Sequence, residues 1–302
     1  MRTRTGKTED DPIGADAEEA VPAPPAPRSP GVAVLTRLLV VLAVLAVAGG
    51  GIWLVTRAST PEASPTTTEI PALQVKAADV RPGSVVPAGG AVAGGAEQQT
   101  SPQQAHSTGP ATLSQWAAQV AAATGVPARA LQAYGNAELA MRADQPGCKI
   151  SWATLAGIGR IESNHGQYAG AVLGADGRPS KPIIGVPLDG SAGVQAIGDT
   201  DGGRYDGDAG VDRAVGPMQF IPSTWRKWAS DGNGDGLGDP QQIDDAALAA
   251  ARYLCAGGRD MASPSGWWAG ILSYNNSTEY AQKVFGLADG YAKAAQSVRK
   301  QG

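Results

Sequence analysis

The sequence has few of the residues that build metal and redox sites. It contains two cysteines and two histidines in 302 residues, and His106 lies in a low-complexity segment, so a structural zinc site is not expected. Aromatic residues make up 5% of the chain, yet six of the seven tryptophans follow residue 110, which places the core there. The net charge is -4 and the pI is near 5.3. Nucleic acid is therefore not an expected partner, because it requires a clustered basic surface.

One long apolar run lies near the N-terminus. Residues 38–55 carry no charge and are bracketed by Arg37 and Arg57, and with residues 31–36 they are long enough to span a bilayer. We expect a transmembrane helix over 31–56, with a cleaved signal peptide as the alternative. More than thirty residues precede the run, which is long for a signal peptide. Basic residues are concentrated before the run, which predicts a cytoplasmic N-terminus and an extracytoplasmic C-terminal domain.

Composition divides the rest of the chain into a tail, a linker and a domain. Residues 1–30 mix acidic residues with proline and alanine and are expected to be a disordered cytoplasmic tail. Residues 57–110 are rich in proline, alanine, glycine and threonine, typical of a flexible linker with a reach of roughly 40 Å. Residues 111–302 form a mostly α-helical domain. Helical patterns cover 113–124, 127–142, 151–166, 244–257, 267–274 and 278–300, and Ser151 is the expected N-cap of the third. A further helix is expected to open at Pro222-Ser223 and to carry Trp225 and Trp228. Residues 166–215 are expected to be a long loop with a short hairpin.

Both cysteines follow the predicted span. If the domain is exported, a disulfide between Cys148 and Cys255 is expected, and two buried free thiols are the alternative. Closing so long a loop stabilises the native state by roughly 4–5 kcal/mol in the chain-entropy model.

One carboxylate lies on the apolar face of a predicted helix. Leu155, Ile158 and Glu162 follow an i, i+3, i+7 spacing within residues 151–166, so they share one face. An ionised carboxylate is unfavourable to bury and keeps its proton to higher pH, and a general acid needs that proton near neutrality. Gly166 can cap the helix C-terminus, where a cleft can open. The alternative is an ordinary surface glutamate at a helix end.

Three short motifs occur in a fixed order: Glu162-Ser163, then Gly216-Pro217-Met218-Gln219-Phe220, then Ser273-Tyr274-Asn275. In this order they resemble the lysozyme-like domain (goose-lysozyme or SLT type) of lytic murein transglycosylases, over about residues 125–290. Segments 214–225 and 244–255 resemble the membrane-bound B-type branch, particularly its actinobacterial versions. Pro217 and Ser273 depart from the leucine and alanine that the family carries there.

The resemblance implies a peptidoglycan lytic transglycosylase, a carbon–oxygen lyase acting on polysaccharides. Glu162 would be the single acid and base that cleaves the β-1,4 bond between N-acetylmuramic acid (MurNAc) and N-acetylglucosamine (GlcNAc) and forms a 1,6-anhydro sugar. Its partners would be peptidoglycan strands and, through the N-terminal helix, the cell membrane, and no cofactor is required for the chemistry. The resemblance also implies the substrate-binding residues Ser163, Met218, Gln219, Tyr274 and Asn275. Met218 and Tyr274 could instead be core residues, and Asn275 a cap of the following helix.

A second motif, at 231–242, has the pattern of a calcium-binding loop. Oxygen-bearing side chains stand at positions 1, 3, 5 and 9 with glycine at position 6. Gln242 stands where a bidentate glutamate is expected, and Asp244 or Asp245 could replace it. B-type transglycosylases, which the chain resembles, carry an EF-hand-like site in this segment. The expected ligands of a structural Ca²⁺ are Asp231, Asn233, Asp235, the Leu237 carbonyl, Asp239 and Asp245, and a metal-free surface loop is the alternative.

Other functions stay open at this point. A lysozyme-type muramidase would use water and an aspartate from 199–208 as base. A non-catalytic wall-binding module or a helical anchor for another protein would need no acid at all. His165 is the only histidine of the domain, and no nucleophile-elbow sequence is present. We therefore expect His165 to stabilise the helix C-terminus by charge or hydrogen bonding.

Overall fold

The computed structural model describes residues 75–84, 110–191 and 194–299. These residues belong to the second of two units of the chain, which spans Thr60–Gly302. The predicted tail at 1–30 and the predicted transmembrane helix at 31–56 lie outside the described residues. Within the described ranges, no helix combines the length and apolar character needed to cross a membrane.

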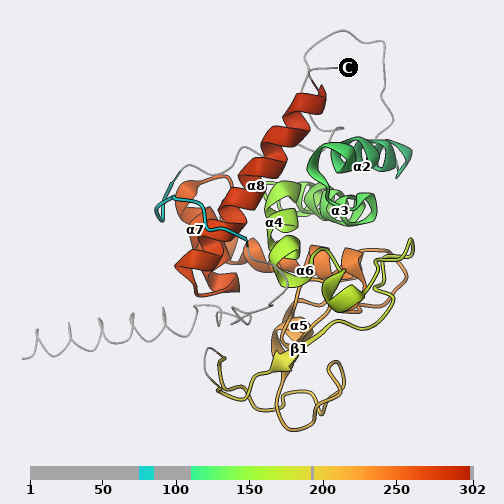
Figure 1. Ribbon diagram of the computed structural model, residues 1–302, viewed down its shortest axis with the longest axis vertical. Coiled ribbons are helices and arrows are strands. Elements are labelled where there is room, and N and C mark those ends of the chain that lie inside the picture. The colour runs from blue at the N-terminus through green and yellow to red at the C-terminus, as the bar shows by residue number, and fades with distance from the viewer. Residues whose placement is uncertain (1–74, 85–109, 192–193, 300–302) are drawn as a thin grey trace, which may run out of the picture. The chain divides into compact units, whose positions relative to one another are not determined.

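The described domain is mostly α-helical, as the sequence predicts (Figure 1). Its α-helices are α2 (Pro110–Thr124), α3 (Ala128–Asp144), α4 (Trp152–Ser163), α5 (Pro222–Trp228), α6 (Ile243–Leu254), α7 (Pro264–Tyr274) and α8 (Thr278–Arg299). Two 3-10 turns, η1 (Tyr168–Gly170) and η2 (Ala256–Gly258), and two strands, β1 (Ile184–Pro187) and β2 (Arg213–Val215), complete the list.

Helix α4 is the central helix, and Figure 1 shows it between α8 and α3. Ten of its twelve residues are buried. Helices α3 and α6 pack together, and α2 covers α3 and α8. A Cβ atom at Gly157 would lie 2.9 Å from the Val284 carbonyl oxygen, so a glycine is needed where α4 and α8 come close. The packing holds the C-terminal end of α4 firmly in the core.

Each end of α4 has a defined cap. The Ser151 side chain accepts a hydrogen bond from the Thr154 N–H, which confirms the predicted N-cap. At the other end, the helix stops at Ser163, and Asn164 is the C-cap with φ 53°. The prediction of a Gly166 cap was wrong by two residues, because asparagine also tolerates the left-handed conformation that ends a helix.

The long loop between α4 and α5 carries the predicted short hairpin. β1 and β2 pair antiparallel, with Ile184 opposite Val215 and Pro187 opposite Arg213. Directly after β2 the chain turns back on itself, because Val215 and Phe220 exchange backbone hydrogen bonds of 2.8 and 3.0 Å.

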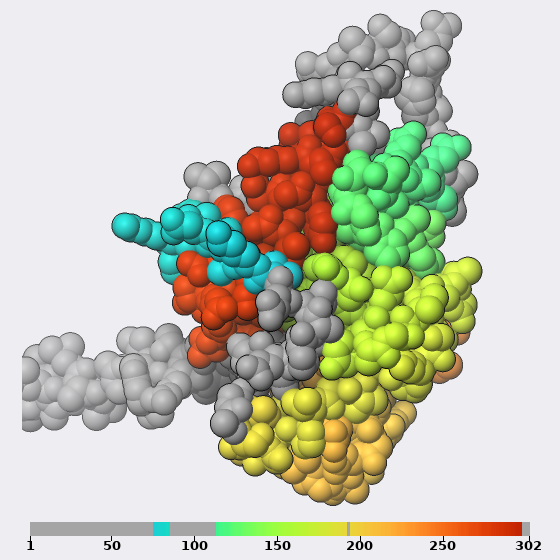
Figure 2. Space-filling model, in the orientation of Figure 1, coloured from blue at the N-terminus to red at the C-terminus, as the bar shows by residue number. Residues whose placement is uncertain are grey.

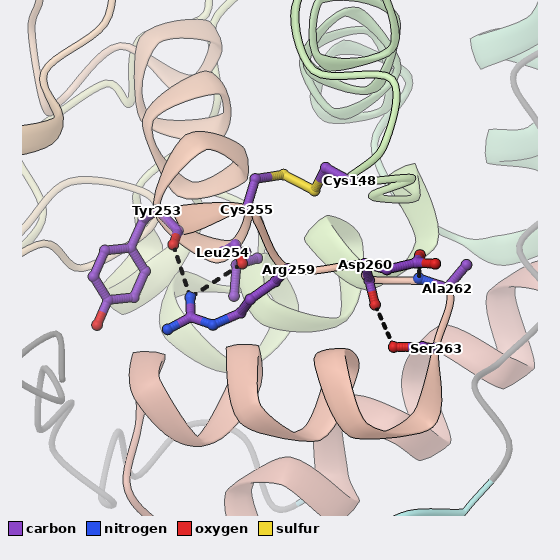
Figure 3. The surroundings of a disulfide bond; sticks show 8 residues. All are labelled: Cys148, Tyr253, Leu254, Cys255, Arg259, Asp260, Ala262 and Ser263. Atoms are coloured by element: carbon purple, nitrogen blue, oxygen red, sulfur yellow. Dashed lines mark hydrogen bonds between the residues drawn. A yellow bond between two sulfur atoms is a disulfide. The ribbon is translucent and has the colours of Figure 1, made fainter. Parts of the chain in front are cut away.

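The two cysteines form the predicted disulfide, which joins the segment after α3 to the end of α6 (Figure 3). The Cα atoms of Cys148 and Cys255 lie 5.5 Å apart across 107 residues of sequence. Next to the bond, the Arg259 guanidinium donates to the Tyr253 and Leu254 carbonyls, both at 3.2 Å. Arginine and disulfide together hold the C-terminal end of α6.

Residues 75–84 lie within the segment predicted to be a linker, and they contact the domain. In Figures 1 and 2 they run across α7 and the first half of α8. Their backbone and the partly buried Val80 contact these helices.

Candidate active site

Glu162 lies in the last turn of α4, with its side chain inside the protein. It is 1% exposed, and Leu155 and Ile158 on the same face are fully buried. The predicted apolar face is therefore confirmed, and it carries the carboxyl into the core. The alternative of a surface glutamate at a helix end was wrong.

The hydroxyl group of Tyr280, in the first turn of α8, donates a hydrogen bond of 2.5 Å to Oε1 of Glu162. Burial raises the pKa of Glu162 from 4.5 to about 8, and the hydrogen bond from Tyr280 lowers it in part. Desolvation therefore dominates, and the carboxyl keeps its proton at neutral pH. Burial and the nearby Glu162 charge raise the pKa of both Tyr274 and Tyr280, so these hydroxyls remain donors throughout.

Sequence reasoning did not identify Tyr280. One signal pointed to it: Tyr280, Val284, Ala288 and Ala292 repeat at i+4 and are all buried, so the tyrosine lies on the core face of α8. A buried tyrosine hydroxyl usually has a hydrogen-bond partner. The sequence contains no sign that the partner is Glu162, which lies 118 residues earlier.

Ser163 connects the first motif to the second. Its Oγ donates to the Pro217 carbonyl at 2.6 Å and accepts from the Gly166 N–H at 2.8 Å. The hydroxyl is fully buried and holds the end of α4 against the turn after β2. Glu162, the preceding residue, lies in the same fixed helix end.

Met218 and Gln219 lie in the tight turn between Val215 and Phe220. Gln219 has φ 49°, and its Nε2 donates to the Gly216 carbonyl at 3.0 Å. Both side chains are buried, with Met218 at 0% and Gln219 at 3% exposure. Gly216 has φ 77°, and a Cβ there would lie 1.7 Å from the Pro240 carbonyl oxygen. The backbone of the turn therefore packs directly on the segment before α6.

Tyr274 connects the third motif to the second. Its hydroxyl donates to the Met218 carbonyl at 2.6 Å, and its ring packs against Phe220 and Tyr253. Asn275 is buried and is the C-cap of α7, with its N–H donating to the Ile271 carbonyl. One alternative from the sequence was that Asn275 caps the following helix, α8. At the start of α8, the Ser277 hydroxyl accepts a hydrogen bond from the Tyr280 N–H. The tertiary structure therefore brings all three motifs together around Glu162.

His165 stabilises the end of α4 by hydrogen bonding but not by charge. Its backbone N–H donates to the Gly159 carbonyl at 2.8 Å, and the Nδ1 atom of its ring lies 3.1 Å from the Tyr134 hydroxyl oxygen. Burial, with a contribution from the Arg160 charge, lowers the pKa of His165 to about 3. The ring is neutral at neutral pH, so the predicted charge effect was wrong.

The predicted calcium loop lies between α5 and α6 and is closed by hydrogen bonds of its own. Asp231 accepts from the Gly234, Asp235 and Gly236 N–H groups. Asp245, at 0% exposure, accepts from three further backbone N–H groups, those of Gly232, Asn233 and Asp239. Asp239 forms an ion pair of 2.5 Å with Arg178. The carbonyl of Leu237, whose side chain is 71% exposed, belongs to the same loop.

A different acidic group is more closely packed. Carboxylate oxygens of Asp199, Asp201 and Asp212 lie within 4.8 Å of one another. Asp199 and Asp201 accept from backbone N–H groups of their own loop, and Asp212 accepts from both the N–H and the hydroxyl of Thr200. These contacts hold the acidic loop together.

Four tryptophans near the C-terminal motifs belong to the core or pack against it. Trp225, Trp267 and Trp268 are at most 3% exposed, and Trp228 packs against the core.

One comparison with known proteins gives a match. Residues 208–270 match the family model of the transglycosylase SLT domain, whereas no curated protein and no solved structure matches the chain. The matched segment contains Met218, Gln219 and the loop between α5 and α6. It begins after Glu162 and ends before Tyr274. The match supports a domain of the lytic transglycosylase type, and the mostly helical fold is consistent with a lysozyme-like SLT domain.

Proposed function

We propose that this protein is a peptidoglycan lytic transglycosylase that cleaves the MurNAc–GlcNAc β-1,4 bond and leaves a 1,6-anhydroMurNAc end. The observation that carries the proposal is the state of Glu162: it is buried, it accepts from Tyr280, and its pKa is raised to about 8. A general acid works best when its pKa lies near the working pH.

Glu162 would act twice in the reaction. Its proton passes to the glycosidic oxygen while the bond from that oxygen to the anomeric carbon of MurNAc breaks. The carboxylate that remains then takes the proton of the MurNAc 6-hydroxyl while that oxygen bonds to the anomeric carbon. Glu162 ends as it began, protonated, and no water is consumed.

Tyr280 would keep the pKa of Glu162 in a range in which the group can both donate and accept the proton. Its hydrogen bond favours the carboxylate, and burial favours the acid. Without the hydroxyl, the acid would hold its proton too tightly to donate it well. Without burial, the group would be ionised before substrate arrived.

A single carboxyl suffices if the acetamido group of the substrate supports the cationic carbon, as in substrate-assisted glycosidases. The aspartates of 199–208, candidate bases for a muramidase, direct carboxylate oxygens at backbone N–H groups of their own loop. This arrangement favours the anhydro route over hydrolysis. Around Glu162, Ser163, Met218, Gln219, Tyr274 and Asn275 are proposed to position the glycan.

The loop between α5 and α6 is proposed to hold a structural Ca²⁺. Its donor set suits a hard cation, because all six proposed ligands are oxygens: Asp231, Asn233, Asp235, the Leu237 carbonyl, Asp239 and Asp245. Bound calcium would neutralise the carboxylates of this loop. Asp239 would exchange its Arg178 partner for the ion.

We also propose that residues 31–56 anchor the protein in the cell membrane with the N-terminus in the cytoplasm. The uncharged run at 38–55 and the basic residues before it support this orientation. The disulfide agrees with an extracytoplasmic domain.

The test is digestion of purified wall glycan by the full-length protein. Mass spectrometry of the fragments is expected to show 1,6-anhydroMurNAc ends, and Glu162→Gln is expected to abolish them while thermal melting shows a folded protein. Reducing MurNAc ends would instead identify a muramidase. Glycan binding without cleavage by the wild type would identify a wall-binding module.

A further inference from the structure

Residues 75–84, which we name the strap, form an ordered segment outside the helices. The strap ends in a turn in which the Ser84 N–H donates to the Arg81 carbonyl at 3.0 Å. Pro82 and Gly83 occupy the two central positions, and Gly83 has φ 86°. Proline followed by a glycine of positive φ is the pattern of a type II turn. The local sequence therefore favours this shape.

Three hydrogen bonds hold the strap on α7 and α8. The Ala78 N–H donates to the Gln282 carbonyl at 3.3 Å, and Gln282 Nε2 donates to the Val80 carbonyl at 2.8 Å. The Trp268 indole N–H, on α7, donates to the Ser84 carbonyl at 3.4 Å. Val80 packs against the core between these contacts. Figure 2 shows the strap lying across the surface of these two helices.

The sequence of α8 also fits the strap. Gly286 lies one turn after Gln282, and a Cβ built there would lie 3.2 Å from the Cβ of Ala78. Glycine inside a helix is less favourable than alanine by about 1 kcal/mol, so a helix-interior glycine calls for a reason. Gly286 leaves room for the strap, whereas a Cβ at Gly290, one turn further along α8, meets nothing within 4 Å.

The strap and the catalytic carboxyl share one stretch of α8. Tyr280, whose hydroxyl donates to Glu162, lies two residues before Gln282, which makes two of the strap contacts. A segment that fixes the first turns of α8 also fixes the position of this hydroxyl. Glu162 also raises the pKa of Tyr274 on α7, and the strap contacts this helix through Trp268.

We propose that residues 75–84 are a positioning element of the catalytic domain, which holds the first turns of α8 so that Tyr280 reaches Glu162. The catalytic consequence rests on the function proposed above, but the docking and its effect on Glu162 do not. The catalytic domain therefore includes residues 75–84 in addition to its helices.

Two matched variants of the full-length chain test the docking. Gly286→Gln puts a large side chain beneath Ala78, and Gly290→Gln places the same side chain on the same helix in open space. Hydrogen–deuterium exchange is the readout. We expect at least tenfold faster exchange of the strap peptide in Gly286→Gln and no change in Gly290→Gln. Gln282→Ala, which removes one donor, is a second releasing variant in case Gly286→Gln does not fold.

The effect on Glu162 is measured by carbon-13 NMR titration of labelled glutamate carboxyls, with Glu162→Gln identifying the resonance. Release of the strap is expected to raise the pKa of Glu162, in the same direction as Tyr280→Phe. In a Tyr280→Phe background the releasing variant is expected to have no further effect, because the hydrogen bond through which the strap acts is already gone.

The outcomes separate the two proposals. Rapid exchange of the strap in the wild type overturns the docking. Release of the strap with an unchanged Glu162 titration, or an equal change in the Tyr280→Phe background, overturns the positioning role. Neither readout requires glycan cleavage, so a wild type that leaves glycan intact would refute the proposed function alone.

Discussion

Replacing Glu162 with glutamine is expected to remove a large pH dependence from the stability of the protein. The pKa of the buried carboxyl rises from 4.5 to about 8. Because the native state holds this proton more tightly than the unfolded state, the stability contribution is complete below pH 4.5 and is lost as pH rises through about 8. Each pKa unit corresponds to 1.36 kcal/mol, so the loss amounts to roughly 5 kcal/mol.

Glutamine has nearly the same shape as the protonated acid and does not ionise. Its side-chain oxygen can still accept from Tyr280, so Glu162→Gln is expected to match the wild type at pH 4.5. Above that pH the variant becomes progressively more stable, by roughly 5 kcal/mol at pH 9. A difference of this size is comparable to the whole stability of many domains.

Denaturant unfolding at intervals between pH 4 and pH 9 measures the difference in the free energy of unfolding between the variant and the wild type. The other titrating groups are the same in both proteins, so their contributions cancel in this difference. A difference that stays constant between pH 5 and pH 8 would mean that Glu162 is ionised in the native state. The proposed acid–base cycle would then lose its starting species, whatever the activity data say.

Further predictions concern the Tyr280 hydroxyl, Gly216, the disulfide and the proposed calcium loop between α5 and α6. Tyr280→Phe removes a hydrogen bond to the ionised form of Glu162, so the pKa of Glu162 is expected to rise by about one to two units. The pH at which the cleavage rate falls on the alkaline side should rise with it, and an unchanged pH profile would contradict this. In Gly216→Ala the new Cβ would lie 1.7 Å from the Pro240 carbonyl oxygen, so the free energy of unfolding is expected to fall by more than about 2 kcal/mol. Thermal melting measures this, and Gly198→Ala, whose Cβ meets nothing within 4 Å, is the control. Replacing both cysteines with serine is expected to reduce stability by about 2–5 kcal/mol in denaturant unfolding, and reduction of the wild type should reproduce it. Calcium added to chelator-treated protein is expected to raise the melting temperature with concentration, and a response that persists in Asp231→Asn would exclude the loop as the site.

The helices with clear local signals were predictable from the sequence. Ser151 marks the start of α4, and the spacing of Leu155, Ile158 and Glu162 defines its buried face, since both depend on neighbours within a few residues. Helices α5 to α8 were also predictable, because the spacing of apolar residues and the capping residues are local signals. The end of α4 was misplaced because both Asn164 and Gly166 can adopt the left-handed conformation, and only packing selects between them.

Tyr280 and the strap were beyond local reasoning. The hydroxyl of Tyr280 and the carboxyl of Glu162 are 118 residues apart in sequence, and Val80 and Gln282 are 202 apart. A pattern within one helix shows that a side chain is buried but not which group it meets. The neutral state of His165 has the same origin, because its pKa depends on burial by other elements.

The sequence by itself determined that the C-terminal part is helical, that its two cysteines can pair, and that an acidic side chain lies on an apolar helix face. Helix periodicity, residue counts and capping are properties of the chain over short distances. Only the tertiary structure decided how strongly that acid holds its proton. Desolvation and the donor on α8 set the balance, and both arise where segments distant in sequence pack against the end of α4.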